Sequence, residues 1–315
     1  MTLHDAGSYT GWMIGRRLFV VAVVLCGLLS LARPHAQAIQ RGLYVSVTDQ
    51  AGTPVPDLGP SDFIVKEDGL AREVLRVGPA EEPMQIAILV DNSQAARNDI
   101  GLIRQALPEF VTAMTAPNEA GRRNQLAIIG VGERPTILAN YSSSPAELQK
   151  GINRIWSLPG SGTYLLDGIV ETSQGFKKRS ATRPVMIAIT REAVEYSNRH
   201  FDQVLDPLHA SGAAFYALAI GQPSTSLSDE ARNRSIVLDR GPTTTGGYRE
   251  QLLTPMALEG KLKLLANQLT HEYLVTYARP QSLIPPEQVT IAAKNPALKA
   301  RGTPINDEAS HERGR

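Results

Sequence analysis

The sequence predicts an α/β fold, in which a doubly wound, mostly parallel sheet carries helices on both faces and is preceded by a small β subdomain. Two observations support this prediction. Short and continuously apolar runs, such as residues 85–90, recur from residue 84 onward, and segments with helical spacing, such as residues 99–115, lie between them. Strands that are apolar on both faces are typical of parallel sheets buried between two layers of helices.

The N-terminal segment, residues 1–38, is expected to be a secretory signal rather than part of the fold. Arg16 and Arg17 precede an apolar run at residues 18–32, and a small-residue cleavage pattern ends at Ala38. This order of charged, apolar and small residues is that of an export signal. The run is shorter than the ~20 residues of a spanning helix, so membrane anchoring by the uncleaved segment is the alternative. We therefore expect export, either to the periplasm or out of the cell.

Residues 39–80 are predicted to form the small β subdomain. Residues 43–49 alternate apolar and polar side chains, as a half-buried strand does. Within residues 62–77, Asp68-Gly69 is a strong hairpin signal between two strands. A unit of this size buries little apolar surface alone, so we expect it to pack against the domain that follows.

Residues 83–280 are predicted to form the main domain, followed by a strand extension at residues 281–300 and a disordered tail at residues 301–315. A Ser/Thr/Gly/Pro-rich stretch at residues 222–247 is expected to be a loop, and residues 273–278 the last strand. The other strands are expected at residues 84–91, 124–132, 185–190 and 214–220, and the helices at residues 99–115, 144–156, 163–176, 201–212 and 257–272.

The composition and the lack of catalytic motifs argue against several classes of function. The 32 Lys and Arg residues balance 31 Asp and Glu residues, so no overall charge attracts nucleic acid or an anionic membrane. The single cysteine, Cys26, lies in the predicted signal, so no disulfide is expected. The sequence contains no P-loop, no Gly-x-Ser-x-Gly elbow and no His-Glu-x-x-His motif, and its six histidines lack metal-ligand spacing.

Polar side chains follow the predicted strands at their carboxyl ends, where ligands of open α/β sheets bind. Asp91 and Ser93 follow the first strand of the main domain. Thr163 lies in the loop before a predicted helix, and Arg191 follows a later strand. An alternative that needs no ligand is that Asp91 and Ser93 cap the next helix.

This pattern resembles the von Willebrand factor A (VWA) family over about residues 83–280. That family carries a metal-ion-dependent adhesion site, which consists of Asp-x-Ser-x-Ser after the first strand, a Thr in a later loop and an Asp after a further strand. Asp91 and Ser93 match the first element, and Thr163 matches the loop Thr. The resemblance implies a Rossmann-like fold and a protein-binding function. Further similarity, to a set of secreted bacterial proteins with this domain, covers residues 47–69, 245–248 and 269–280.

Two positions depart from the metal site of that family. Ala95 replaces its second Ser, and Arg191 replaces its last Asp. Mg²⁺ takes about six oxygen ligands, and a guanidinium about 5 Å away would repel it by roughly 6 kcal/mol at an effective dielectric of ~20. We therefore expect Mg²⁺ binding by Asp91, Ser93 and Thr163 to be weakened or lost, with no other cofactor. We hypothesise that the Arg191 guanidinium takes the place of the metal and pairs with Asp91.

The sequence thus predicts an exported protein-binding module of adhesion or scaffold type, without catalytic activity. Its partner, a protein of unknown identity, would present an acidic side chain to the chain's own strand-end residues, Asp91, Ser93, Thr163 and Arg191. Neither nucleic acid nor membrane is expected as a partner, apart from membrane contact by an uncleaved N-terminal segment.

Two alternative functions are left open. The first is a hydrolase that uses Asp91 or Ser93 in the same cleft, which requires a base such as His200 or His209 near the hydroxyl. The second is a structural envelope protein anchored by its N-terminal segment.

Overall fold

The computed structural model describes residues 39–223, 225–281 and 284–305. The predicted signal or anchor, residues 1–38, lies outside the described residues, as does the C-terminal end from residue 306. Within the described part of the chain, no helix combines the length and the apolar content that crossing a membrane requires.

The main domain contains a six-stranded sheet with the strand order β10-β9-β8-β5-β6-β7. All neighbouring strands are parallel except β6 and β7, so the predicted doubly wound, mostly parallel sheet is confirmed. Neither edge strand was expected from the sequence, because β7 has no buried residue and β10 has only four residues. The strands are β5 (Gln85–Val90), β6 (Gln125–Gly130), β7 (Thr136–Ser142), β8 (Pro184–Arg191), β9 (Ala214–Ile220) and β10 (Arg249–Leu252).

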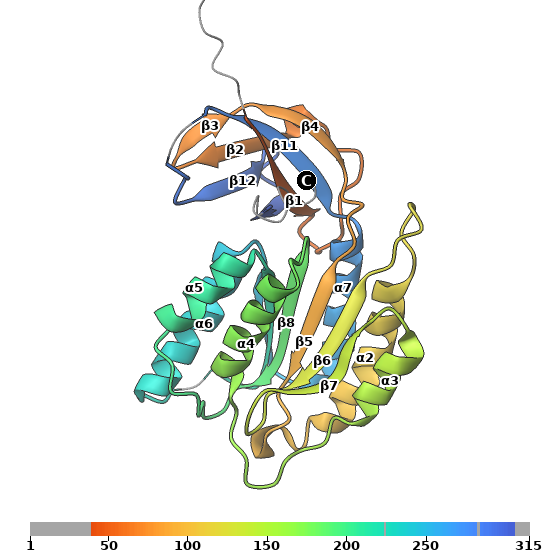
Figure 1. Ribbon diagram of the computed structural model, residues 1–315, viewed down its shortest axis with the longest axis vertical. Coiled ribbons are helices and arrows are strands. Elements are labelled where there is room, and N and C mark those ends of the chain that lie inside the picture. Colours follow the sequence, from red (N-terminus) through yellow and green to blue (C-terminus); the bar gives the residue numbers. More distant parts are fainter. Residues whose placement is uncertain (1–38, 224, 282–283, 306–315) are drawn as a thin grey trace, which may run out of the picture. The chain divides into compact units, whose positions relative to one another are not determined.

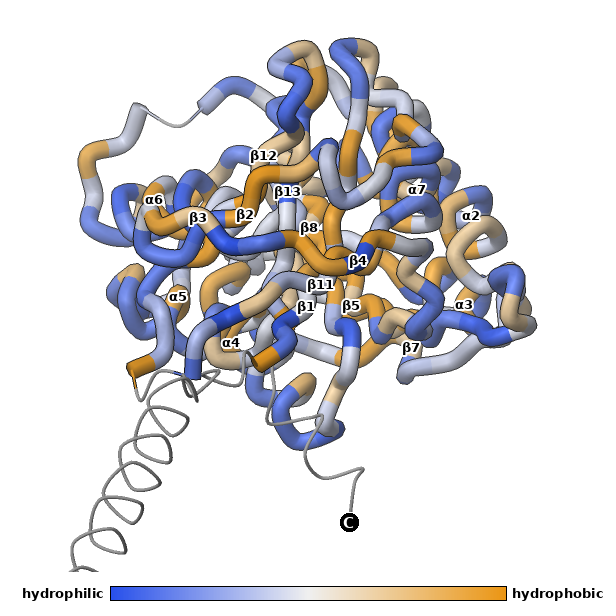
Figure 2. The backbone as a smooth tube through the Cα atoms, turned by 90° about the horizontal axis from the view of Figure 1, so that it is seen from above, coloured by the Kyte–Doolittle hydropathy of each residue, from blue (hydrophilic) through white to orange (hydrophobic). Residues whose placement is uncertain are grey.

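Helices cover both faces of this sheet (Figure 1). Figure 2 shows hydrophobic and hydrophilic stretches alternating along α2 and α7, as expected for helices that bury one side. One layer consists of α2 (Ile100–Thr115), α3 (Pro145–Asn153) and α7 (Leu258–Thr270), and the other of α4 (Leu165–Lys178), α5 (Asp202–Ser211) and α6 (Asp229–Thr244). Three 3₁₀ turns are η1 (Pro60–Asp62), η2 (Gln94–Ala96) and η3 (Pro255–Ala257).

The helix α6 corrects the prediction that residues 222–247 form a loop. The Ser228 hydroxyl accepts a hydrogen bond from the Ala231 N–H and so caps the first turn. Val237 and Leu238 are fully buried against the sheet. The prediction is wrong only for the residues of α6, since the described residues of 222–228 and residues 245–247 are not helical. Gly241, Pro242, Thr243 and Thr244 lie at the end of α6, so packing of the apolar positions outweighs their weak helix propensity.

The small β subdomain contains two sheets, with the strand orders β13-β1-β11-β4 and β12-β2-β3. The predicted hairpin is confirmed: β2 and β3 pair antiparallel across Asp68 and Gly69, whose φ angles of 48° and 81° are those of a primed hairpin turn. Its strands are β1 (Ile39–Thr48), β2 (Phe63–Glu67), β3 (Leu70–Arg72), β4 (Val74–Pro79), β11 (Tyr273–Arg279), β12 (Val289–Ala293) and β13 (Lys299–Pro304).

Two predictions about the C-terminal part are wrong. The strand β11 pairs with β4 of the subdomain rather than with the parallel sheet. The strand β13 covers residues 299–304 and pairs with β1, although residues 301–315 were expected to be disordered. The strand β11 contributes buried residues to the core of the subdomain, and β13 extends its four-stranded sheet beside β1. The subdomain is therefore built from two segments that lie far apart in the sequence.

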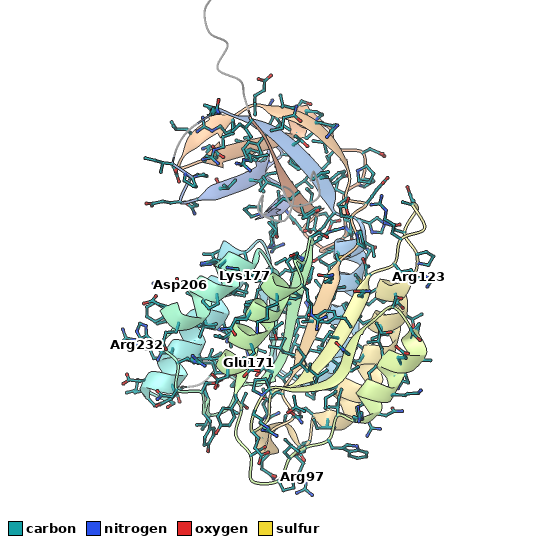
Figure 3. All side chains as sticks on the ribbon, in the orientation of Figure 1. Arg97, Arg123, Glu171, Lys177, Asp206 and Arg232 are labelled. Carbon is teal, nitrogen blue, oxygen red and sulfur yellow. The ribbon has the colours of Figure 1, made fainter. Side chains whose placement is uncertain are left out.

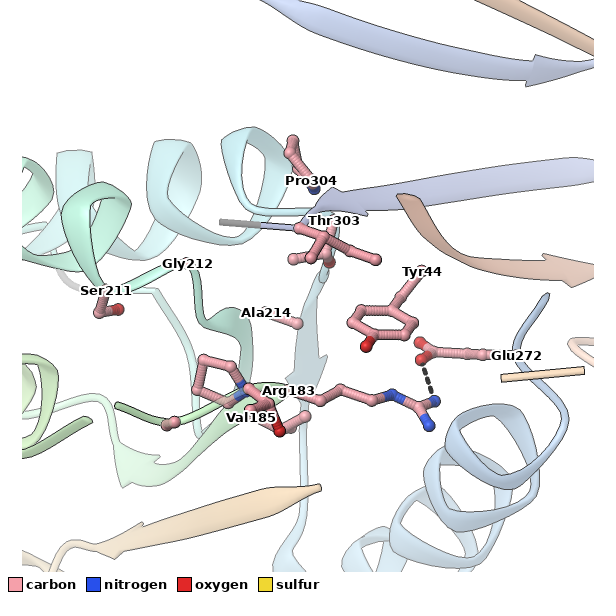
Figure 4. A pocket seen from close by; sticks show the side chains of 13 residues that line it. Tyr44, Arg183, Val185, Ser211, Gly212, Ala214, Glu272, Thr303 and Pro304 are labelled. Atoms are coloured by element: carbon pink, nitrogen blue, oxygen red, sulfur yellow. Dashed lines mark hydrogen bonds and ion pairs between the residues drawn. The ribbon is translucent and has the colours of Figure 1, made fainter. Parts of the chain in front are cut away.

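The buried Arg183 connects the subdomain and the linker to the main domain. Its guanidinium donates to the carbonyl oxygens of Ala80 and Glu82, both at 3.0 Å, and lies 2.6 Å from the Glu272 carboxylate. The guanidinium also lies 4.7 Å from the centre of the Tyr44 ring. Figure 4 shows Arg183 and Glu272 facing each other beside Tyr44. The expected packing of the subdomain against the main domain therefore involves a buried and paired cation.

Candidate functional site

The winding of the sheet reverses between the neighbouring strands β5 and β8. The chain leaves β5 for α2 on one face and leaves β8 for α5 on the other. Open α/β sheets bind ligands outside the carboxyl ends of the strands at such a point. Asp91 directly follows β5 and Arg191 ends β8, so two of the predicted site residues lie at this position.

Asp91, Ser93 and Thr163 form one buried hydrogen-bonded cluster, and each is at most 1% exposed. Asp91 Oδ1 accepts from the Ser93 N–H at 3.0 Å, and Oδ2 accepts from the Thr163 hydroxyl at 3.0 Å. The Thr163 and Ser93 hydroxyl oxygens lie 3.1 Å apart. Neither Asp91 nor Ser93 caps α2, whose N-cap is Asp99. Ser93 is the N-cap residue of the short turn η2, but its side chain makes no capping hydrogen bond, so capping does not account for these two side chains.

Arg191 does not make the predicted ion pair with Asp91. Its guanidinium Nη1 instead lies 2.6 Å from Asp99 Oδ2, at the start of α2. Only the backbone N–H of Arg191 reaches Asp91, donating to Oδ2 at 3.1 Å. The reason is that neutral donors from the surrounding loops already satisfy the Asp91 carboxylate, whereas Asp99 is 3% exposed and makes no helix-capping hydrogen bond.

A second cation, which was not expected from the sequence, adjoins the cluster from α6. Arg234 is 3% exposed and donates to the Thr190 hydroxyl and the Arg191 carbonyl oxygen, both at 2.8 Å. The Thr190 hydroxyl lies 3.4 Å from Asp91 Oδ2, so it connects the guanidinium to the cluster. Arg234 also lies 3.1 Å from the Glu192 carboxylate. No sequence signal pointed to Arg234, because its segment was expected to be a loop.

Glu195 is a second buried carboxylate next to Arg234, in addition to Glu192. Its Oε2 lies 3.5 Å from Arg234 Nε, and neither atom has a hydrogen-bond partner. Burial raises the pKa of the Glu195 carboxyl to about 7, although the Arg234 charge and a hydrogen bond from Ser197 oppose this rise. Glu195 forms a backbone bridge with Thr163, so the loop after β8 is joined directly to the cluster.

Exposed apolar side chains surround the buried cluster. Val194 and Tyr196, in the loop after β8, are 63% and 56% exposed. A Cβ atom on Gly162, next to Thr163, would lie 2.0 Å from the Tyr196 ring, so only glycine permits this contact. Trp156 is 61% exposed, and its carbonyl oxygen accepts from the Asn92 side chain beside Asp91. We call Trp156, Val194 and Tyr196 the apolar rim.

Residues 86–192 match the family model of the von Willebrand factor type A domain. This chain contains a VWA domain. The matched range begins in β5 and ends just after β8, so it includes Asp91, Ser93, Thr163 and Arg191. No curated protein matches the chain in sequence.

Several solved structures are similar to this chain in fold, at low sequence identity. Proximal thread matrix protein 1 of the mussel byssus is 15% identical, with 61% of this chain and 49% of that protein covered and a TM-score of 0.48. The VWA protein of Catenulispora acidiphila is 10% identical, with coverage of 86% and 73% and a TM-score of 0.47. The pilus adhesin SpaC of Lactobacillus rhamnosus GG is 11% identical, with coverage of 84% and 48% and a TM-score of 0.48. The chain thus matches about half the length of the mussel and Lactobacillus proteins.

The residues of this VWA domain do not fit the Mg²⁺ shell that its family implies. Mg²⁺ requires near-octahedral oxygen coordination, but Ala95 supplies only a methyl group, and Arg191 supplies no oxygen ligand from its side chain, which pairs with Asp99. Both Asp91 oxygens already accept hydrogen bonds from the protein. Within residues 39–223, 225–281 and 284–305, no group of three or more His, Cys, Asp or Glu side chains is arranged to hold a metal.

Neither histidine named for the hydrolase alternative hydrogen-bonds to the Ser93 hydroxyl in the described structure. The Ser93 hydroxyl contacts Thr163. His209 Nε2 contacts the Thr244 hydroxyl at 2.7 Å, and His200 lies 3.2 Å from the Asp202 carboxylate. No observation therefore favours nucleophilic attack by Ser93.

Proposed function

We propose that this chain is an exported, non-catalytic protein-binding module whose partner docks at the carboxyl ends of the strands without Mg²⁺. The observation that carries this proposal is the Asp91–Ser93–Thr163 cluster, which is closed by the protein's own hydrogen bonds and surrounded by the apolar rim. Exposed apolar and aromatic side chains around a polar centre are a common arrangement at protein interfaces.

Arg191 is the residue through which an acidic partner would bind. Its side chain is 36% exposed, and only Nη1 contacts Asp99. The Nε and Nη2 groups have no partner among the described residues, so a partner carboxylate can bind beside Asp99. Charge-assisted hydrogen bonds of this kind add specificity and make association sensitive to salt.

A capture experiment with the purified protein tests the proposal. Proteins from the exported fraction are captured in Mg²⁺ and, separately, in a chelator, and the partner is then identified. We expect equal capture under both conditions and weaker capture at high salt. Capture that requires Mg²⁺ would contradict metal independence.

Variants locate the binding face. Arg191→Ala is expected to weaken the affinity for the captured partner by about tenfold or more, and Val194→Ser to weaken it a few-fold through the apolar rim. Lys177→Ala is the control, because Figure 3 shows Lys177 on α4 at the end far from Arg97 and the strand carboxyl ends. Equal loss in all three variants would place the partner elsewhere.

A further inference from the structure

A groove between α2 and α7 continues past the ends of these helices toward the small β subdomain. It consists of two adjoining cavities of about 660 Å³ and 940 Å³. Ala113, Asn267 and Thr270 line both cavities, so the two are continuous. The 13 residues of α7 correspond to ~20 Å of helix length. A groove along this helix is therefore long enough for about six residues of an extended peptide.

The floor of the groove is largely apolar. In the first cavity, small side chains leave room between the helices, because Gly260 and Ala113 face the opening. In the second cavity, the walls are formed by the proline-containing loop at residues 53–58, by the end of β4 and by the segment between β4 and β5. The apolar lining includes Ala113, Leu264, Val55, Pro117, Leu269 and Tyr273.

The rim of the groove is acidic, although the whole chain has a net charge of +1. Asp57, Glu81, Glu119 and Glu259 line the groove, are exposed, and form no ion pair with any described residue. The remaining carboxylates there are each paired with a cation: Glu82 with Arg122, Glu109 with Lys263, and Glu272 with Arg183. The groove therefore has excess negative charge around an apolar floor.

We propose that this groove binds a basic, extended segment of a partner protein, whose apolar side chains enter the floor while its Lys or Arg side chains meet the four unpaired carboxylates. Burial of apolar side chains supplies affinity, and the surrounding negative charge selects a cationic segment and accelerates its association.

This second surface is separate from the candidate site. Met84 and Asn124, which line the groove, precede β5 and β6, whereas Asp91 follows the carboxyl end of β5. The two surfaces share no lining residue, so binding at the groove neither requires nor excludes the proposed function at the strand carboxyl ends.

A labelled ten-residue peptide of alternating lysine and leucine serves as the probe, and fluorescence anisotropy measures its binding to the purified protein at low salt. A peptide with glutamate in place of lysine is the comparison. We expect the lysine peptide to bind at least tenfold more tightly than the glutamate peptide. The triple variant Glu81→Gln/Glu119→Gln/Glu259→Gln should weaken lysine-peptide binding at least tenfold.

The matched control removes the same charge from the other helical layer. The triple variant Glu171→Gln/Asp206→Asn/Glu230→Gln changes exposed carboxylates on α4, α5 and α6, and Figure 3 labels Glu171 and Asp206 there. It should alter the affinity for the peptide by less than twofold. A further variant, Ala113→Trp, fills the groove without changing charge and should also weaken binding at least tenfold.

Two results would overturn the proposal. Equal weakening by both triple variants would mean that the peptide senses only the overall charge. A purified protein that is dimeric in sedimentation experiments, and becomes monomeric on Ala113→Trp, would show that a second copy of this chain occupies the groove.

Discussion

Arg191, at the end of β8, forms a 2.6 Å ion pair with Asp99 at the start of α2. This pair links the two elements between which the winding of the sheet reverses. Asp99 is nearly buried, whereas Arg191 is partly exposed to solvent. Loss of the ion pair would therefore leave the Asp99 carboxylate without compensation for its burial, while water could still solvate the Arg191 guanidinium.

Removal of this cation should therefore destabilise the fold. Arg191→Gln leaves Asp99 buried without its charged partner, and we expect the free energy of unfolding in urea to fall by about 1–2 kcal/mol. Lys263→Gln removes an exposed ion pair with Glu109 and should cost less than about 0.5 kcal/mol. Equal effects of the two substitutions would show that the pair with Asp99 contributes nothing specific.

The Thr163 hydroxyl should stabilise the buried cluster. Thr163→Val keeps the shape of the side chain but removes the donor to Asp91 and the contact with Ser93. A buried carboxylate that loses a donor costs about 1–3 kcal/mol, measured as the free energy of unfolding. The control is Thr112→Val on the exposed surface of α2, for which a change within about 0.5 kcal/mol is expected.

Glu195 should make stability depend on pH. Burial raises its pKa from 4.5 to about 7, so the folded protein holds this proton more tightly than the unfolded chain does. Its contribution to stability is complete below about pH 4.5 and is lost as the pH rises through 7. Relative to the wild type, Glu195→Gln should thus gain stability between about pH 5 and 7.5, on the order of 3 kcal/mol. Parallel stability curves for the two proteins would contradict this assignment.

Arg183 should be among the most sensitive positions for stability. Arg183→Met leaves Glu272 buried and unpaired and removes donors to two carbonyl oxygens, so we expect a loss of about 3–5 kcal/mol in urea unfolding. Adding Glu272→Leu removes the unpaired charge and should recover part of that loss. A double variant as unstable as the sum of both single variants would exclude this coupling.

Mg²⁺ should leave the melting temperature of the wild-type protein unchanged, because Ala95 and Arg191 do not supply the family's ligands. In the double variant Ala95→Ser/Arg191→Asp, the missing hydroxyl and carboxylate are restored. At tenfold excess over its dissociation constant, Mg²⁺ should then stabilise the variant by about 1.4 kcal/mol. Thermal unfolding with Mg²⁺ and with Ca²⁺ or chelator measures this gain, and a response of the wild type would contradict the proposal.

Local patterns in the sequence were sufficient for the four central strands of the main domain and for most of its helices, but not for its edge strands or α6. Continuous apolar runs predicted β5, β6, β8 and β9, and amphipathic spacing predicted α7. The polar residues at the strand ends then located the cluster of Asp91, Ser93 and Thr163, because parallel strands bring their carboxyl ends to one edge of the sheet.

The sequence by itself determined the type of sheet, the position of the candidate site at its edge and the hairpin at Asp68-Gly69, since these depend on periodicity and turn chemistry within short segments. Only the tertiary structure decided that β11 and β13 belong to the small subdomain and that Arg191 pairs with Asp99 while Arg234 is buried beside the cluster. The reason is that strand pairing and buried ion pairs depend on which distant groups come within a few ångströms, and short-range patterns carry no information about that choice.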